Sequence, residues 1–371
     1  MFLMEPIDFS CRGLLVSKMH DTAKGIVSNL ISLRDKFGFV LNGARKYYTN
    51  RRSLTRLCSQ PPLLSAMVYE IYSRTGFHKV TIHDAEGCNH TLSRYYAMWN
   101  KPRPESSTID TATASKLSNA SEKQHLYRQL ASGAETGWDF SSRWMRNVSD
   151  LTTLATTSII PVDLNAFILQ MELNIAFLAK VTGDRITAAR FLEAAKARKL
   201  AMNSVFWNEE MGQWLDYWIS DKTKCKVVPA KSVFVSICED LKLVEKVRES
   251  LQRSGLIRAV GIATSLTNSG QQWDFPNGWA PIQHLIVEGL VRSGSKEAKS
   301  MAKDIAARWI RTNYVFYKKT NTMSEKYDVE KCGEYGGGGE YVPQSGFGWS
   351  NGVVLAFLEE FGWPKDLKID C

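Results

Sequence analysis

The sequence lacks the cysteine spacings of metal fingers and redox centres, and it contains few strand-like segments. Its seven cysteines include no C-x-x-C pair, and their odd number argues against a complete disulfide framework. Alternation of apolar and polar residues is rare and short, as in residues 80–83. These absences argue against zinc modules and dithiol oxidoreductases, and they favour a mainly helical fold.

Long apolar runs and leader-like segments are also missing. No run of about eighteen apolar residues occurs, which argues against a membrane span. Residues 1–12 carry Glu5 and Asp8, and they lack the basic–apolar–small order of a signal peptide. We therefore expect neither a signal peptide nor a transmembrane segment in this chain.

The net charge of +9 is dispersed along the chain. Lysine and arginine are scattered over helix-like stretches such as residues 194–200, and they form no basic tail. This distribution argues against a nucleic-acid partner, and no stable protein partner is implied. With 44% hydrophobic and 23% charged residues, the composition is that of a globular protein with a large core.

Amphipathic helices are abundant. Apolar residues recur at i, i+3, i+4 and i+7 after Asp163, which we expect to cap a helix that ends at Gly183. Asp184 is expected to cap the next helix. Further helices are predicted over residues 282–291 and 296–312.

Four loops rich in tryptophan, glycine and carboxylates separate successive helix pairs. Helix pairs need neighbours to cover their apolar faces, and closing them into a ring supplies those neighbours. The sequence therefore predicts a single domain over residues 1–371, an all-α (α/α) toroid whose loops converge on one pocket. The loops are residues 137–144, 207–218, 271–281 and 325–349.

The loop composition suits a carbohydrate ligand, because sugar C–H faces pack on tryptophan while hydroxyls bind polar side chains. Core filling is the alternative role for these tryptophans, but the recurrence of four such loops after successive helix pairs favours the sugar-binding role. Glycoside hydrolysis needs two carboxyl groups, and spacing alone does not choose them. The candidates are Asp139, Asp216, Asp274, Glu325 and Glu340.

Five segments resemble those of the α,α-trehalases, a family of inverting glycoside hydrolases, and they are closest to the plant members. They occur in the family's order, and the resemblance extends from about residue 13 to residue 363. The segments are 102–106 (PRPES), 135–144 (ETGWDFSSRW), 272–281 (QWDFPNGWAP), 325–328 (EKYD) and 336–341 (GGGGEY).

The resemblance implies a toroid of the six-hairpin type that hydrolyses trehalose to two glucose molecules with inversion. It makes Asp139 the general acid and Glu325 the general base, with a separation of about 6.5 to 9.5 Å between their carboxyl groups. No metal or organic cofactor is implied, and the family suggests a secreted or plasma-membrane-anchored enzyme. The implied substrate contacts are Asn42, Arg51, Gln60, Arg103, Glu105, the backbone of Gly137, and Glu340.

The residues around the two carboxylates agree with these roles. Trp138 and Phe140 flank Asp139, and apolar neighbours favour the protonated form that an acid catalyst needs. Lys326 follows Glu325 and carries a charge that can help that base to remain ionised. The glycines at 336–339 either let the backbone approach a ligand or form a flexible linker.

Two further side chains have alternative roles that the sequence leaves open. Arg143 either grips two sugar oxygens or serves as a structural ion-pair partner. Asp274 either binds a sugar hydroxyl or caps a helix that begins near Trp279.

Three departures from the family bear on activity. The family's N-terminal signature is absent, residues 52–58 interrupt a contact group, and residues 75–79 join two family segments abruptly. We therefore expect a toroid that is incomplete at its N-terminus. The alternative function is a catalytically inactive trehalose-binding or regulatory fragment. An unfolded product and a hydrolase of another glucoside are the remaining alternatives.

Overall fold

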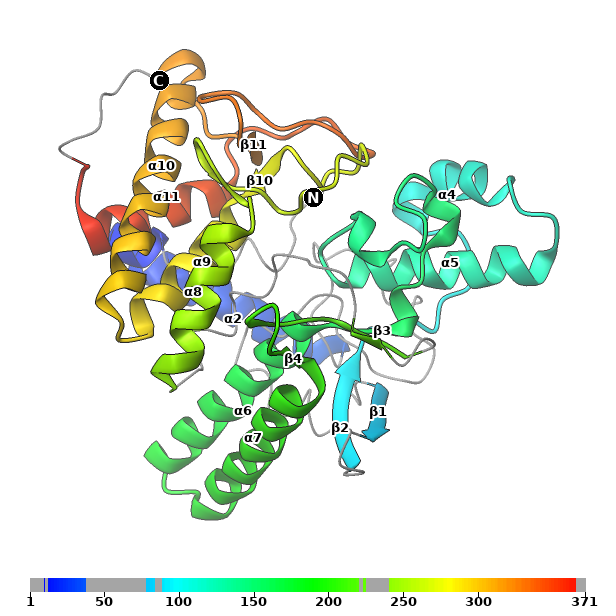
Figure 1. Cartoon of the computed structure of the whole chain (residues 1–371), viewed down its shortest axis with the longest axis horizontal. Helices are drawn as coiled ribbons and strands as arrows, with labels where there is room; N and C mark the ends of the chain where they lie inside the picture. The colour runs from blue at the N-terminus through cyan, green and yellow to red at the C-terminus, as the bar shows by residue number, and fades with distance from the viewer. Residues whose placement is uncertain are drawn as a thin grey trace. The chain divides into compact units, whose positions relative to one another are not determined.

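The structure is a computed structural model that describes residues 10, 13–37, 78–83, 89–219, 223–224 and 240–364. Helices dominate this part of the chain, and the strands are short (Figure 1). The α-helices are α2 (His20–Phe37), α4 (Ser107–Ala114), α5 (Ala120–Glu135), α6 (Val162–Val181), α7 (Arg185–Phe206), α8 (Leu241–Arg253), α9 (Ala280–Arg292), α10 (Lys296–Thr320) and α11 (Gly348–Phe361). The 3-10 helices are η3 (Pro104–Ser106), η4 (Ser142–Trp144), η5 (Leu151–Thr153) and η6 (Thr156–Ser158).

The strands pair as hairpins or small ribbons. The predicted alternation at residues 80–83 lies in a strand that pairs antiparallel with the next one, from His78 opposite Arg94 to His83 opposite Asn89. The strands are β1 (His78–His83), β2 (Asn89–Arg94), β3 (Ile159–Ile160), β4 (Trp207–Asn208), β5 (Gln213–Trp214), β6 (Tyr217–Trp218), β7 (Thr223–Lys224), β8 (Ile257–Arg258), β9 (Gly261–Ile262), β10 (Asn277–Trp279) and β11 (Lys326–Asp328).

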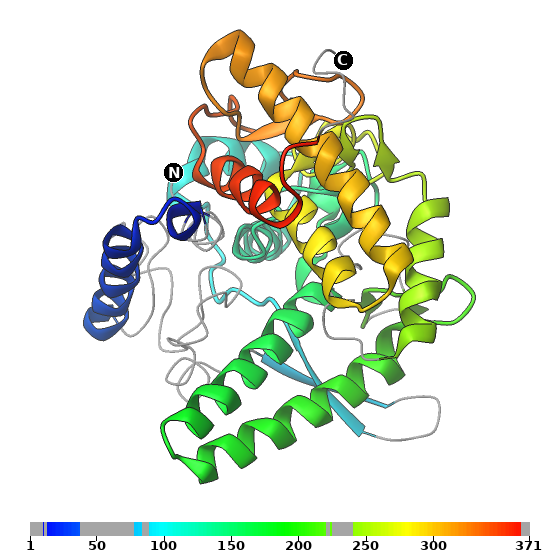
Figure 2. The same ribbon diagram turned by 90° about the vertical axis from the view of Figure 1, so that its left-hand side faces the viewer.

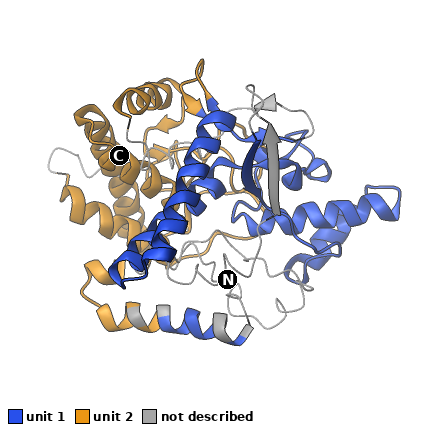
Figure 3. Cartoon of the chain, turned by 90° about the horizontal axis from the view of Figure 1, so that it is seen from below, with its two compact units in different colours: residues 1–4, 28–207, 214–226 blue, residues 5–27, 208–213, 227–371 orange. Residues whose placement is uncertain are grey.

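The chain forms two compact units, which Figure 3 shows in different colours. Unit 1 carries helices α4 to α7, and unit 2 carries helices α8 to α11. Unit 1 comprises residues 1–4, 28–207 and 214–226, and unit 2 comprises residues 5–27, 208–213 and 227–371.

Helices α6 and α7 of unit 1 form the helical hairpin that the apolar periodicity predicts (Figure 2). Gly183, with a φ of +85°, follows the end of α6, and the Asp184 carboxylate caps α7 by accepting the Thr187 N–H at 3.0 Å. Both of these boundary predictions are confirmed. The buried apolar cluster along the hairpin consists of Tyr95, Leu164, Ile168, Met171, Ile175, Ala176 and Phe191.

The predicted cap at Asp163 is wrong. Helix α6 begins one residue earlier, at Val162, and Pro161 stands at the cap position without a side-chain bond. The Asp163 carboxylate instead accepts a hydrogen bond of 2.6 Å from Arg143, a partner that the sequence does not reveal. A charge-assisted bond to a buried guanidinium is stronger than a neutral cap, which explains the choice.

Helix α6 is a core helix although its composition resembles a membrane span. Among the described residues it alone has the length and the mean hydropathy (20 residues, 1.3) to cross a bilayer. However, 67% of the helix is buried inside the protein, and its Glu172 accepts two bonds from Arg198 at 3.0 and 2.9 Å. This buried ion pair joins α6 to α7 and matches the packing of a protein interior.

Helices α9, α10 and α11 of unit 2 pack against one another. Helix α9 confirms the prediction for residues 282–291, while α10 continues two turns beyond the predicted end at Thr312. The reason is that the buried face of α10 continues through Asn313 and Phe316, before Asn321 ends the helix in the left-handed conformation. The α10 prediction was therefore right in type and short in length.

In each unit, two of the four predicted loops converge. In unit 1 the loop at 137–144 reaches the loop at 207–218 through the ion pair between Arg143 and Asp216, with Nε and Oδ2 2.8 Å apart. In unit 2 the loops at 271–281 and 325–349 meet as the antiparallel pair β10–β11. The loops therefore join in pairs, while the convergence of all four on one pocket stays a prediction.

The loop tryptophans mostly serve the core, contrary to the expectation that their faces would receive a sugar. Trp273 and Trp279 stack at 4.1 Å between ring centroids, and Trp349 packs edge-on against Trp279 at 5.4 Å. Ring–ring contacts of this kind favour burial over an open face. The buried loop tryptophans are Trp138, Trp144, Trp214, Trp218, Trp273, Trp279 and Trp349.

Candidate active site

The loop that carries Asp139 starts where helix α5 ends. Thr136 closes the helix because its backbone N–H and its hydroxyl both donate to the Gly133 carbonyl, at 3.0 and 2.7 Å. Gly137 follows with a φ of +79°, a conformation that favours glycine. The Trp138 N–H then donates to the Thr136 hydroxyl at 2.9 Å, so the backbone before Asp139 is fixed by its own turn.

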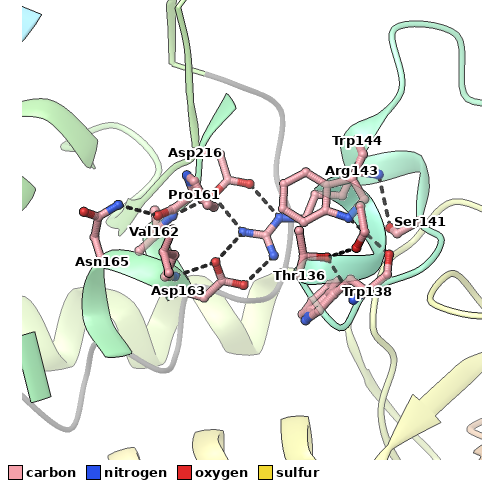
Figure 4. A network of polar contacts seen from close by, with 12 residues as sticks. Thr136, Trp138, Ser141, Arg143, Trp144, Pro161, Val162, Asp163, Asn165 and Asp216 are labelled. Carbon is pink, nitrogen blue, oxygen red and sulfur yellow. Dashed lines mark hydrogen bonds and ion pairs between the residues drawn. The ribbon is translucent and has the colours of Figure 1, made fainter. Parts of the chain in front are cut away.

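A buried guanidinium holds the far end of this loop (Figure 4). Arg143 donates to both oxygens of Asp163, at 2.6 and 3.1 Å, and to both oxygens of Asp216, at 2.8 and 2.9 Å. Burial alone would lower the pKa of Arg143, but the two carboxylates outweigh it and the net shift is upward. Between the two roles left open for Arg143, the structure supports the ion-pair role, since four bonds are made within the chain.

Aromatic residues on both sides of Asp139 lie against arginines. The Arg143 guanidinium lies 4.7 Å from the Trp138 ring centroid, and the Arg103 guanidinium lies 5.0 Å from the Phe140 ring centroid. Trp138 and Phe140 are buried while Asp139 is half-buried. The loop therefore carries the half-buried Asp139 between two anchored aromatic residues.

The proposed sugar contacts near this loop occupy defined positions. Arg103 is buried, and its Nε and Nη2 donate to the Asp110 carboxylate at 3.0 and 2.7 Å. Glu105 is half-buried in η3, two residues along the chain. The sequence analysis did not single out Asp110, which lies in helix α4 while Arg103 precedes η3.

Glu325 of unit 2 has one anchored and one open carboxylate oxygen. Oε2 accepts the Gln344 N–H at 3.1 Å, and the Glu325 N–H donates to the Gln344 carbonyl at 2.9 Å. Oε1 has no partner among the described residues. Burial raises the pKa of Glu325, and the Gln344 amide and Lys326 oppose that rise only in part. A half-buried carboxylate held by one oxygen can accept a proton through the other.

The glycine block at 336–339 packs against the loop at 270–277, so it is not a flexible linker. A Cβ on Gly336 would lie 2.2 Å from Asn277 Oδ1, and one on Gly338 would lie 2.5 Å from the Gly270 carbonyl oxygen. The Gly337 carbonyl accepts from the Asn277 side chain at 3.0 Å. Gly336 and Gly338 are thus needed for close contact between two segments of this chain.

Gly338→Ala is expected to destabilise the protein, while Gly337→Ala is not. Gly338 has a φ of +75° and no space for a Cβ, whereas a Cβ on Gly337 would meet nothing within 4 Å. Strain and overpacking together predict a loss of about 2 to 4 kcal/mol in the free energy of unfolding for Gly338→Ala. Equilibrium denaturation of the two variants measures the difference, and equal stabilities would contradict this packing.

Asp274 does not cap helix α9, and both of its carboxylate oxygens are bonded within its own loop. Its Oδ1 accepts from the Ser265 hydroxyl at 2.8 Å, and its Oδ2 accepts from the Ser269 hydroxyl. Helix α9 has Trp279 at its cap position without a side-chain bond. The fully buried Asp274 therefore fixes its own loop, since a buried carboxylate needs hydrogen-bond donors nearby.

Glu340 is half-buried directly after the glycine block, next to the exposed Tyr341. Among the described residues, no group of three or more histidine, cysteine, aspartate or glutamate side chains could hold a metal ion. The described part of the chain thus places Glu340 in the same loop system as Glu325, and it places Asp139, Gly137, Arg103 and Glu105 in the other unit.

Comparison with known proteins identifies the family. The family model described as Trehalase matches residues 9–85 and 76–362, through both units. A probable trehalase of Oryza sativa subsp. japonica is 56% identical over 405 residues, which cover 97% of this chain and 70% of the relative. The chain belongs to the trehalase family. A trehalase of Arabidopsis thaliana is 55% identical, with 97% of this chain and 62% of that trehalase covered.

A solved trehalase structure shows the fold of this family member. Neutral trehalase Nth1 from Saccharomyces cerevisiae is similar with a TM-score of 0.71 at 24% identity, covering 97% of this chain and 71% of the yeast chain. The chain thus has the all-α toroidal fold that the sequence predicts. It also spans only 70% and 62% of the lengths of the two plant trehalases.

Proposed function

We propose that this chain hydrolyses α,α-trehalose to two glucose molecules with inversion at one anomeric carbon. Asp139 donates a proton to the bridging oxygen as the bond from that oxygen to the anomeric carbon breaks. Glu325 accepts a proton from a water molecule whose oxygen bonds to the same carbon from the opposite face. One glucose leaves as the α-anomer, and the attacked glucose is released as the β-anomer.

The observation that carries this proposal is the family match, which includes the loops bearing both carboxylates. The surroundings of Glu325 support its role, because Oε1 is left without a partner in the described chain while Oε2 is fixed. The anchored rings beside Asp139 support a fixed position for the acid. We interpret both units as parts of one catalytic domain, because the family match runs through both.

The substrate contacts are part of the same proposal. Arg103, Glu105, the Gly137 backbone and Glu340 are expected to bind glucose hydroxyls. A buried arginine whose orientation is fixed by a carboxylate loses little entropy when it binds a sugar oxygen, which suits Arg103. Three further proposed contacts fall outside the described residues, and they are Asn42, Arg51 and Gln60.

The test is the anomeric composition of the first product. Proton NMR of the purified chain with trehalose distinguishes the two glucose anomers before they interconvert. We expect equal amounts of α- and β-glucose at early times, because only one of the two anomeric carbons is inverted. Early release of α-glucose alone would exclude inversion. Binding of trehalose in a calorimeter without any glucose release would overturn the hydrolase proposal in favour of an inactive binding fragment.

A further inference from the structure

Lys326 is a buried cation beside the proposed general base. It is the only lysine among the described residues that is fully buried, with an exposed fraction of 0%. It lies in β11 opposite Trp279 of β10, and its ammonium lies 5.3 Å from that ring centroid. Burying an ammonium is costly unless hydrogen bonds and a countercharge compensate, so its retention needs an explanation.

The contacts of the Lys326 ammonium are neutral. Nζ donates to the Gly338 carbonyl at 3.1 Å and to the Gln272 side-chain oxygen at 3.4 Å. No described carboxylate lies within 4.0 Å of Nζ. These two bonds tie the glycine block and the loop at 270–277 to the strand that follows Glu325. They do not supply a countercharge.

The charged group that acts on the Lys326 ammonium is the carboxylate of the preceding residue, Glu325. Burial lowers the pKa of Lys326 to about 8, and Glu325 opposes this shift, so the ammonium remains the main form at neutral pH. In return, Lys326 opposes the upward shift that burial gives to the pKa of Glu325. Two groups of the described residues oppose the upward pKa shift of Glu325, the Gln344 N–H and the Lys326 ammonium, and Lys326 is the charged one of the two; the charge of the N-terminal amino group also lowers this pKa.

We propose that Lys326 is a positioning residue for the general base, whose buried ammonium keeps the Glu325 carboxylate ionised and ties the two loops around it together. This inference rests on the proposed function. A leucine or methionine in the same space would avoid the desolvation cost but would leave Glu325 without a countercharge. Replacing Lys326 by a neutral residue should therefore raise the pKa of Glu325, so that Glu325 keeps its proton to higher pH.

The first test is the pH dependence of kcat/KM for Lys326→Met. We expect the acid limb to move to higher pH by about one unit, the low end of the pKa shifts that an opposite charge nearby produces. Lys319→Met is the matched control, because Lys319 is an exposed lysine of unit 2 that pairs with Glu334 at 2.9 Å. A purely structural role for Lys326 would lower activity at every pH and leave the limb in place.

The second test needs no turnover. Denaturation midpoints are measured for Lys326→Met, Glu325→Gln and the double variant. Each single variant leaves one charge without its partner, and the double variant removes both charges. The double variant should therefore lose less stability than the two single variants lose in sum. If Lys326→Met does not fold, Lys326→Gln replaces it, since its amide keeps a donor toward the Gly338 oxygen.

The outcomes separate the two proposals. An unmoved acid limb in a folded Lys326 variant, or strictly additive losses in the cycle, would overturn the role of Lys326. Absence of glucose release by the unmodified chain would overturn the proposed function, while the double-mutant cycle would still decide whether the two charges are coupled.

Discussion

Arg143→Met is expected to lower the free energy of unfolding by about 3 to 5 kcal/mol, because it leaves two buried carboxylates without their cation. The Arg143 side chain is buried, and it makes four bonds of 2.6 to 3.1 Å to Asp163 and Asp216. Methionine fills similar space without a charge. Equilibrium denaturation, monitored by circular dichroism, gives the difference in the free energy of unfolding between the variant and the unmodified chain.

The control for Arg143 is a cation that is exposed in the same unit. Lys196 pairs with Glu193 at 2.9 Å, and both side chains are 73% exposed, so Lys196→Met should change stability by no more than about 0.5 kcal/mol. Arg143→Lys keeps the charge but loses the bidentate geometry, and it should fall between the two. Equal stability of the Arg143→Met and Lys196→Met variants would show that the buried pairs contribute nothing measurable.

The second large effect is on catalysis. Asp139→Asn and Glu325→Gln should each lower kcat for trehalose by about 100- to 10,000-fold, since each removes one proton transfer from the transition state. Neither change alters side-chain size appreciably. Glucose release at saturating trehalose, with circular dichroism to confirm folding, measures the loss.

A substrate with a good leaving group separates the two roles. Fluoride departs from α-glucosyl fluoride with little need for protonation, so Asp139→Asn should recover activity on it while Glu325→Gln should not. The controls are Asp150→Asn, whose carboxylate caps η5, and Glu334→Gln on the surface of unit 2. The role assignment is overturned if either catalytic variant turns over trehalose at the rate of the unmodified chain.

Local signals in the sequence predicted the helices well and the side-chain partners poorly. Gly183 and Asp184 mark a helix boundary through their own backbone and side-chain preferences, and both predictions are confirmed. Asp163 was expected to cap a helix on the same local reasoning, but it binds Arg143, twenty residues away. A local rule fails where a distant charge offers a stronger bond.

In the candidate site, too, local signals identified residues but not their distant partners. Its motif residues, including Asp139 and Glu325, stand out in the sequence because the loop composition and the family resemblance both select them. The burial of Lys326 and the bond from Arg103 to Asp110 had no such signal. Whether a polar residue lies in a core depends on every segment packed around it, and a pattern along one segment does not contain that information.

The sequence by itself determined the helical class, the hairpin boundaries and the family, because periodicity, capping residues and motifs are properties of short stretches of chain. Only the tertiary structure decided that the loop tryptophans fill the core, that Gly336 and Gly338 admit a neighbouring loop, and that Arg143 is an ion-pair residue. The physical reason is that burial and electrostatic partnership arise between segments far apart in the chain, after the helices have packed.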